Sequence, residues 1–231
     1  MNIFKLYAAA LSLIIISFTN SLQAQIKWGA RAGVNFTALN ATNEQEIELE
    51  TEYVTRFSIG ISADIPVISD FYIQPSLLYS GKGYKADAGS IGFSKGFNAN
   101  VSYIELPLHI LYKPKVGPGS LILGVGPYLA YGAGGKWKAD ETVLIGDIMI
   151  DNKGDIKFKN DASTNDYGTY IYGKPWDYGT SAVIGYDLFN TYTFQLNAEW
   201  GMANLEPKWG SYKPKGERKN KGFGISVGYK F

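Results

Sequence analysis

Gly222-Phe223-Gly224-Ile225-Ser226-Val227-Gly228-Tyr229-Lys230-Phe231 alternates strictly between apolar side chains and Gly, Ser or Lys. Successive side chains of a β-strand point to opposite faces, so the apolar residues at odd positions share one face and the other face is nearly bare. A strand with an apolar outer face that ends on an aromatic residue is typical of a transmembrane β-barrel. The rest of the chain can be tested against that expectation.

The first residues have the pattern of an export signal. Met1–Lys5 carry one positive charge, Leu6–Phe18 form an apolar run too short for a membrane helix, and a small residue stands at Ala24. We predict a signal peptide over residues 1–24 and a single barrel domain over residues 25–231. No later stretch approaches the roughly 20 apolar residues that a membrane helix needs.

Composition excludes several classes of protein. The chain has no cysteine, so it can form no disulfide framework. Without Lys5 of the predicted signal, the 22 basic residues become 21 against 21 acidic ones, so no net charge attracts nucleic acid and no nucleic-acid partner is expected. The 27 glycines and 17 tyrosines disfavour a helical bundle.

The two-residue period recurs throughout the mature chain and predicts an all-β, eight-stranded antiparallel transmembrane barrel. The predicted strands are Ile26–Thr37, Tyr53–Ile65, Phe71–Ser80, Asn100–Tyr112, Ser120–Gly132, Tyr178–Asp187, Tyr192–Gly201 and Gly222–Phe231. Their connections alternate between long and short, which is the pattern of outer-membrane barrels with long external loops and short periplasmic turns. The longest connection is Ala133–Asp177. We therefore predict a location in the bacterial outer membrane, with both termini on the periplasmic side.

Several motifs in these strands resemble the small outer-membrane β-barrel family of Bacteroidetes envelopes, also called PorT-like or porin-family proteins. The resemblance covers the strands and leaves out the external loops. The matching motifs are Ala32-Gly33-Val34-Asn35-Phe36, Tyr103-Ile104-Glu105-Leu106-Pro107-Leu108, Gly124-Val125-Gly126-Pro127-Tyr128, Asp177-Tyr178-Gly179, Gly201-Met202-Ala203-Asn204-Leu205 and Gly228-Tyr229-Lys230-Phe231. The resemblance implies that Tyr229 and Phe231 belong to the signal read by the outer-membrane assembly machinery.

A group of ionisable residues shares the inward parity of the predicted strands. The interior of an eight-stranded barrel is only wide enough for side chains, so charges there must pair or be solvated. We predict a structural polar cluster in the lumen, which argues against a solute-conducting pore. Its predicted members are Arg31, Asp64, Glu105, His109 and Glu199.

The predicted function is that of a structural or binding element that acts through its long external loops. No catalytic, cofactor-binding or metal site is predicted, and the register turns His109, the one histidine, into the lumen. Three alternatives stay open: an outer-membrane enzyme that acts on lipid or peptide, an accessory barrel of a secretion system, and a soluble ligand-binding barrel. Expected partners are outer-membrane lipid, lipopolysaccharide, the assembly machinery and an envelope protein bound by the loops. A monomer is expected.

Two external loops that barrel closure makes neighbours carry opposite charge. The segment 202–221 is rich in lysine, whereas Glu44, Glu46, Glu48, Glu50 and Glu52 alternate with other residues. We expect the second predicted strand to continue above the bilayer with these glutamates over the barrel mouth. Two outcomes are open: a charge network between the loops, or binding of lipopolysaccharide phosphates by the basic loop.

Overall fold

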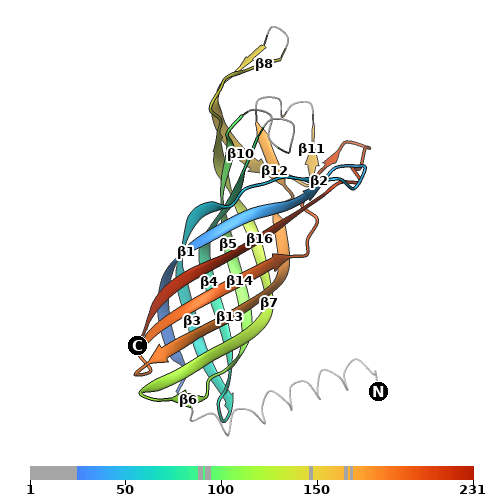
Figure 1. The fold of residues 1–231 in the computed structure, drawn as a ribbon. Helices are drawn as coiled ribbons and strands as arrows, with labels where there is room; N and C mark the ends of the chain where they lie inside the picture. The colour runs from blue at the N-terminus through green and yellow to red at the C-terminus, as the bar shows by residue number, and fades with distance from the viewer. Residues whose placement is uncertain (1–24, 88–90, 92–94, 146–147, 164–165, 167–168) are drawn as a thin grey trace, which may run out of the picture.

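A computed structural model describes residues 25–87, 91, 95–145, 148–163, 166 and 169–231. The predicted signal peptide, residues 1–24, lies outside the described residues. Eight long antiparallel strands close into a tilted barrel (Figure 1), as the sequence predicts. They are β1 (Lys27–Thr42), β3 (Val54–Ile68), β4 (Phe71–Ala86), β5 (Phe97–Tyr112), β7 (Gly119–Lys138), β13 (Trp176–Leu188), β14 (Tyr192–Gly201) and β16 (Glu217–Lys230).

Each barrel strand pairs with its neighbours along the chain, and the last strand closes the barrel against the first. The β1–β16 ladder is continuous from Gly29 opposite Lys230 to Thr42 opposite Glu217. Short turns join β3 to β4, β5 to β7 and β13 to β14 at the end where the C-terminus lies (Figure 1). The long connections all leave the opposite end. No helix among the described residues is long and apolar enough to cross a membrane.

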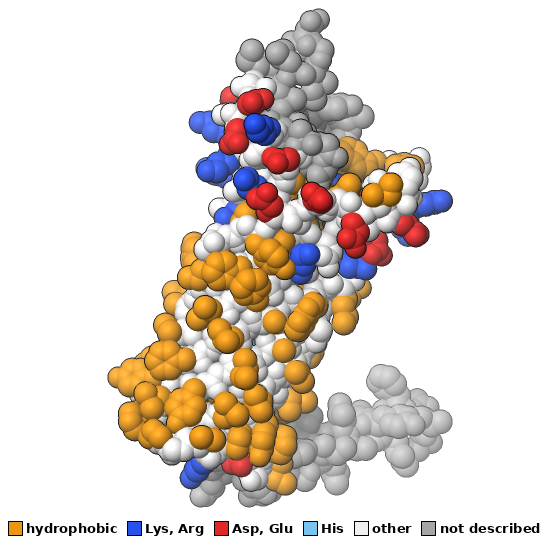
Figure 2. All heavy atoms as spheres, viewed as in Figure 1, with side chains coloured by type: hydrophobic (Ala, Val, Ile, Leu, Met, Phe, Trp, Pro, Cys, Tyr) orange, Lys and Arg blue, Asp and Glu red, His pale blue; other side chains and the backbone are white. Residues whose placement is uncertain are grey.

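Side chains on the barrel wall alternate between an exposed apolar face and a buried polar face. On β14, Leu196 is 54% exposed, whereas the adjacent Gln195 is 5% exposed. Figure 2 shows the apolar side chains spread over the barrel strands and most charged ones gathered above them. Aromatic pairs border this band, with Phe71–Tyr112 and Tyr192–Tyr229 near the turns and Phe36–Phe223 and Tyr131–Trp176 toward the long loops. Such girdles mark the two lipid interfaces.

The strands are longer than predicted at the end with the long loops. There β4 continues to Ala86, β5 begins at Phe97 and β7 continues to Lys138. In this part the apolar parity reverses: Phe97, Ala99 and Val101 are fully buried on the inner face of β5, whereas Asn100 is exposed. The strands therefore continue outside the lipid as the wall of a water-exposed barrel, whose apolar residues face inward.

The external connections contain short strands of their own. They are β2 (Glu48–Leu49), β8 (Val143–Ile145), β9 (Ile148–Ile150), β10 (Lys153–Phe158), β11 (Asp161–Ala162), β12 (Tyr170–Gly173) and β15 (Lys208–Trp209), while β6 (Lys115–Val116) lies in a turn. Strand β10 pairs with the upper part of β7, and β12 pairs with β10 in parallel. Part of the connection predicted as the loop Ala133–Asp177 is thus paired with the rim of the barrel through β10 and β12, whereas β8 and β9 form a separate hairpin.

Candidate functional site

The lumen near the short turns is closed by four buried charges. The ammonium of Lys113 lies 2.8 Å from Oδ2 of Asp64 and 2.6 Å from Oδ2 of Asp187. Lys230 contacts the same two oxygens, at 2.6 Å from that of Asp187. Gln74 adds a hydrogen bond from Nε2 to Oδ1 of Asp64 at 2.7 Å. We call Asp64, Lys113, Asp187 and Lys230 the lower network. It contains equal numbers of opposite charges, as a buried ionic cluster requires.

A second group of charges occupies the other end of the lumen. The ammonium of Lys82 lies 2.8 Å from Oε2 of Glu105, 3.0 Å from Oε2 of Glu199 and 3.9 Å from Oδ2 of Asp177. It also lies 4.5 Å from the centre of the Tyr128 ring, within the range of a cation–π contact. We call Lys82, Glu105, Asp177 and Glu199 the upper network. It places one cation among three carboxylates from different strands.

Between the two networks, small polar side chains line a cavity of about 20 Å³. This volume holds about one water molecule. His109 lines the cavity and its Nε2 lies 2.8 Å from Oγ of Ser181, while its Nδ1 hydrogen-bonds no other residue that the structure describes. Arg31 also lines it and donates from Nη1 to Oε1 of Gln195 at 3.2 Å. Within the described ranges no carboxylate hydrogen-bonds the imidazole of His109, as one would in a hydrolytic triad.

The five residues predicted as one lumen cluster are therefore divided among three levels. Asp64 lies in the lower network, Glu105 and Glu199 lie in the upper network, and Arg31 and His109 lie between them. Sequence reasoning missed the lysines that pair with these acids. It placed Lys82 and Lys113 in the connections between strands, so these side chains were not assigned to the inner face of the barrel. Lys230 stands on the inward parity of the final strand, a signal that was available.

An aromatic core covers the outer end of the lumen. Tyr172 of β12 is fully buried, and its ring lies 5.8 Å from that of Tyr84 and 5.5 Å from that of Phe158. Its hydroxyl donates to Oδ1 of Asn220 at 2.7 Å. Burial raises the pKa of Tyr172 well above its ordinary value, so the hydroxyl stays a neutral donor. We call this covering part, built from β10, β12 and the upper ends of the barrel strands, the cap.

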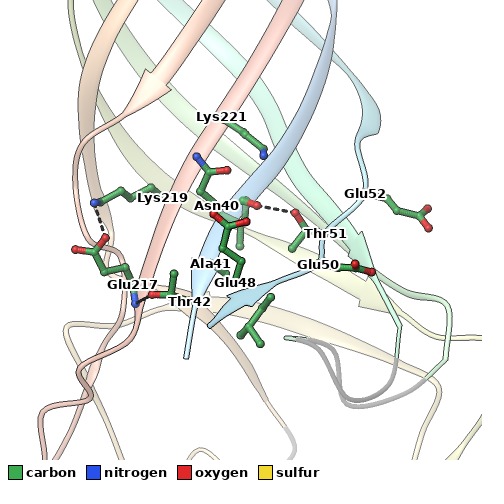
Figure 3. Close-up of a pocket in the computed structure, with 12 residues that line it drawn as sticks. Asn40, Ala41, Thr42, Glu48, Glu50, Thr51, Glu52, Glu217, Lys219 and Lys221 are labelled. Atoms are coloured by element: carbon green, nitrogen blue, oxygen red, sulfur yellow. Dashed lines mark hydrogen bonds and ion pairs between the residues drawn. The ribbon is translucent and has the colours of Figure 1, made fainter. Parts of the chain in front are cut away.

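A groove of about 550 Å³ lies on the outer flank of the wall, where the upper ends of β1 and β16 meet β2. Figure 3 shows its lining side chains on these three strands and on the segment that follows β2. Leu39, Ala41 and Leu49 contribute apolar lining, and the polar residues are Asn40, Thr42, Glu48, Glu50, Thr51, Glu52, Glu217, Lys219 and Lys221. The groove was not predicted, because it depends on the β1–β2 and β1–β16 registers.

The expectation for the glutamates is only partly met. The segment does continue along β1, since Glu48 pairs opposite Thr42. However, Glu48 shares the outward parity of Thr42 and Asn40, so it lines the flank groove and does not cover the barrel mouth. The chain between Leu49 and Val54 has one residue more than the β1 segment opposite it, which changes the parity.

Charge pairing between the two loops is also different from the expected network. Glu217 pairs with Lys219 in its own strand at 2.6 Å, and Glu52 pairs with Lys85 of β4 at 3.5 Å. Charged side chains contact the other loop in a different way: the hydroxyl of Tyr212 donates a hydrogen bond to Glu44, and the ammonium of Lys221 lies 5.7 Å from the centre of the Tyr53 ring. The two loops are joined mainly by the backbone ladder of β1 and β16.

The model of a protein family described as "Outer membrane protein beta-barrel domain" matches residues 19–206. The chain belongs to this family. The protein is therefore an outer-membrane barrel, and its apolar band faces the lipid of that membrane. A comparison with curated proteins finds no match.

Solved structures of outer-membrane proteins are similar to this barrel. OprG of Pseudomonas aeruginosa is 11% identical with a TM-score of 0.47, and the match covers 89% of this chain and 95% of OprG. Ail of Yersinia pestis, solved with the heparin analogue sucrose octasulfate, is 9% identical with a TM-score of 0.43 and coverage of 90% and 99%. The outer membrane protease OmpT of Escherichia coli is 9% identical with a TM-score of 0.38 and coverage of 91% and 98%.

Proposed function

We propose that this outer-membrane barrel is a structural and binding element that acts through its external parts and conducts no solutes. The observation that carries the proposal is the upper network, in which Lys82 is 2% exposed and contacts carboxylates from three strands. A lumen that is filled at this level leaves no path for a solute. The lower network and the cap add two further obstructions along the same axis.

The build of the external region supports a binding role. Long loops that only connected strands would need no core, yet the cap buries Tyr172, Phe97 and Leu205 completely. Burying such side chains stabilises a folded surface above the membrane by roughly 1.5 to 3 kcal/mol each. A stable external surface is suited to contact with a partner, and we propose an envelope protein or outer-leaflet lipid in that role.

An enzymatic role is less well supported. His109 is 3% exposed and its hydroxyl partner Ser181 is 4% exposed, deep between the two ionic networks. A hydrolytic centre has to admit a lipid or a peptide to its nucleophile. We further propose that the chain belongs to the PorT-like group of Bacteroidetes barrels and is monomeric, on the strand motifs quoted above. A role in a secretion system would be one form of the proposed binding function.

Conductance in planar lipid bilayers tests the absence of a pore. The wild-type chain should give no current steps, and a variant with Lys82, Glu105 and Glu199 all replaced by Ala should stay closed as well, because the lower network and the cap still obstruct the lumen. Regular steps from the wild type would contradict the proposal. A photo-crosslinker at exposed Lys157 of β10 in intact envelopes tests binding, with Lys115 at the opposite end as the control position.

A further inference from the structure

The flank groove lies directly above the outer aromatic girdle. Lys221 stands opposite Trp200 on one side and Ala38 on the other, and the next outward residue of β16 is Phe223. The ring of Phe223 lies 5.1 Å from that of Phe36 and 5.6 Å from that of Tyr53. Aromatic girdles lie at the level of the lipid headgroups, so the groove opens where the headgroups of the outer leaflet begin.

The charges of the groove are arranged along the membrane normal. At its base the ammonium of Lys221 lies 5.7 Å from the centre of the Tyr53 ring and makes no ion pair with another described residue. Farther from the lipid, Lys219 is neutralised by Glu217. Glu52 is paired with Lys85 of β4. Glu48, opposite Thr42, makes no ion pair within the described part of the chain. A cation therefore lies next to the membrane, and a carboxylate lies above it.

We propose that the groove binds a zwitterionic lipid headgroup in which a phosphate is followed by a primary ammonium, as in phosphoethanolamine. The phosphate, which is nearer the acyl chains, contacts Lys221 and the amide of Asn40. The ammonium, which extends into water, contacts the carboxylate of Glu48. This inference rests on the proposed binding role of the external parts and names the chemistry of one ligand.

The balance of charge disfavours a purely anionic ligand. Among the charges that line the groove, Glu217 is paired with Lys219 and Glu52 with Lys85, whereas Glu48 and Lys221 make no ion pair with a described residue. A second phosphate would lie among carboxylates, where like charges repel. A headgroup with a phosphate and a primary ammonium can pair with both Lys221 and Glu48. Its ammonium also donates hydrogen bonds that a quaternary ammonium cannot donate.

Native mass spectrometry of the full chain in detergent tests the proposal. The lipids added are phosphatidylethanolamine, phosphatidylglycerol and phosphatidylcholine with identical acyl chains. The wild type should retain phosphatidylethanolamine over the other two. Glu48→Gln should lower the preference of the protein for phosphatidylethanolamine over phosphatidylglycerol by about two- to fivefold, which is the range expected for a partly exposed ion pair. Lys221→Gln should lower the retention of both lipids, because both carry the phosphate.

Matched controls are Glu141→Gln in an external loop and Lys115→Gln at the opposite end, and the heat-dependent shift in gel mobility verifies that every variant is folded. Equal retention of the three lipids by the wild type would overturn the proposal, as would an unchanged preference in Glu48→Gln. An equal loss in Glu141→Gln would do the same, because the effect would then be one of general charge. Conductance does not depend on Glu48, so failure here is separable from failure of the proposed function.

A competition experiment separates two sources of this headgroup. Lipid A with and without a phosphoethanolamine group is added to the complex with phosphatidylethanolamine. Displacement by the modified form alone supports a glycolipid as the source, and displacement by neither supports the phospholipid. Equal displacement by both forms contradicts recognition of the ammonium.

Discussion

The ammonium of Lys230 lies 2.6 Å from Oδ2 of Asp187, although the two residues belong to strands that are separated by β14. Lys230 also reaches Asp64, which lies two strands away in the other direction. The penultimate residue of the chain therefore joins strands on both sides of the closing β1–β16 ladder. The contact with Asp64 spans the β1–β16 ladder, whereas the contact with Asp187 spans β14.

Removing Lys230 should destabilise the closed barrel. In Lys230→Met, two buried carboxylates share the single cation Lys113, and breaking a buried ion pair typically costs about 3 to 5 kcal/mol. We expect the urea midpoint of the chain in lipid vesicles to fall accordingly, and the double variant Lys230→Met/Asp187→Asn to recover part of the loss. Lys115→Met, an exposed lysine at the same end, is the control. Equal midpoints for Lys230→Met and the wild type would refute a stabilising role of the lower network.

A charged side chain on the lipid-facing wall should impair folding of the barrel. Leu196 is exposed at the middle of β14, opposite Ile184 and Ile225 on the neighbouring strands. Arg near the bilayer midplane costs roughly 2 to 4 kcal/mol, so Leu196→Arg should reduce the folded fraction in vesicles, measured by the gel shift. Asn40→Arg, which points outward above the girdle, should have little effect. If the two variants fold equally well, the register or the position of the membrane is wrong.

Phe231 should matter for assembly more than for stability. Its backbone N–H donates to the carbonyl of Trp28 at 2.9 Å, but its side chain is 74% exposed and packs little. We expect the chain without Phe231 to refold in detergent with nearly normal stability and yet to accumulate unassembled in the periplasm of cells. Phe231→Tyr should assemble normally. Normal insertion of the shortened chain in cells would remove the proposed role of the terminal aromatic residue.

The two neighbouring external loops should be coupled by packing and backbone pairing, with little contribution from the glutamates. Leu39 is 1% exposed and belongs to the buried core that includes Leu205. Leu39→Asp should therefore accelerate protease cleavage within residues 206–216, since a buried carboxylate opens this core. Ile47→Asp, at a site that is 61% exposed, is the matched control. Replacing Glu46 and Glu48 by Lys should leave the cleavage rate unchanged, and faster cleavage in that variant would support a charge network between the loops.

The sequence predicted the barrel because lipid imposes one rule on every strand: apolar side chains face outward and alternate with polar ones. The rule does not hold above the lipid, and for this reason the predicted start of β5, at Asn100, was three residues too late. Ile104 is apolar and outward, whereas Val101 is apolar and inward, so the period appears to stop although the strand continues. A search for a point at which the apolar side chains change from the outer to the inner face would have found the longer strand.

The ionic networks and the groove were harder to predict for a different reason. Contacts such as Lys113 with Asp187 depend on the register of several strands at once, and an error of one residue turns every side chain to the other face. Parallel pairing of β12 with β10 has no local signal in the sequence. The inward parity of Glu105 could be read from one strand, but its partner Lys82 required the true end of β4.

The reversal of parity in β5 also determines how deeply the protein is immersed. Along its outer face, Asn98, Asn100 and Ser102 are followed by Ile104, Leu106 and Leu108. Displacement toward the periplasm by one two-residue repeat, roughly 5 Å along the normal for a tilted strand, would immerse Ser102 in hydrocarbon. Displacement the other way would bring Ile104 into water. The barrel thus has a single preferred depth, and the height of the cap and the groove above the cell surface is fixed by the wall itself.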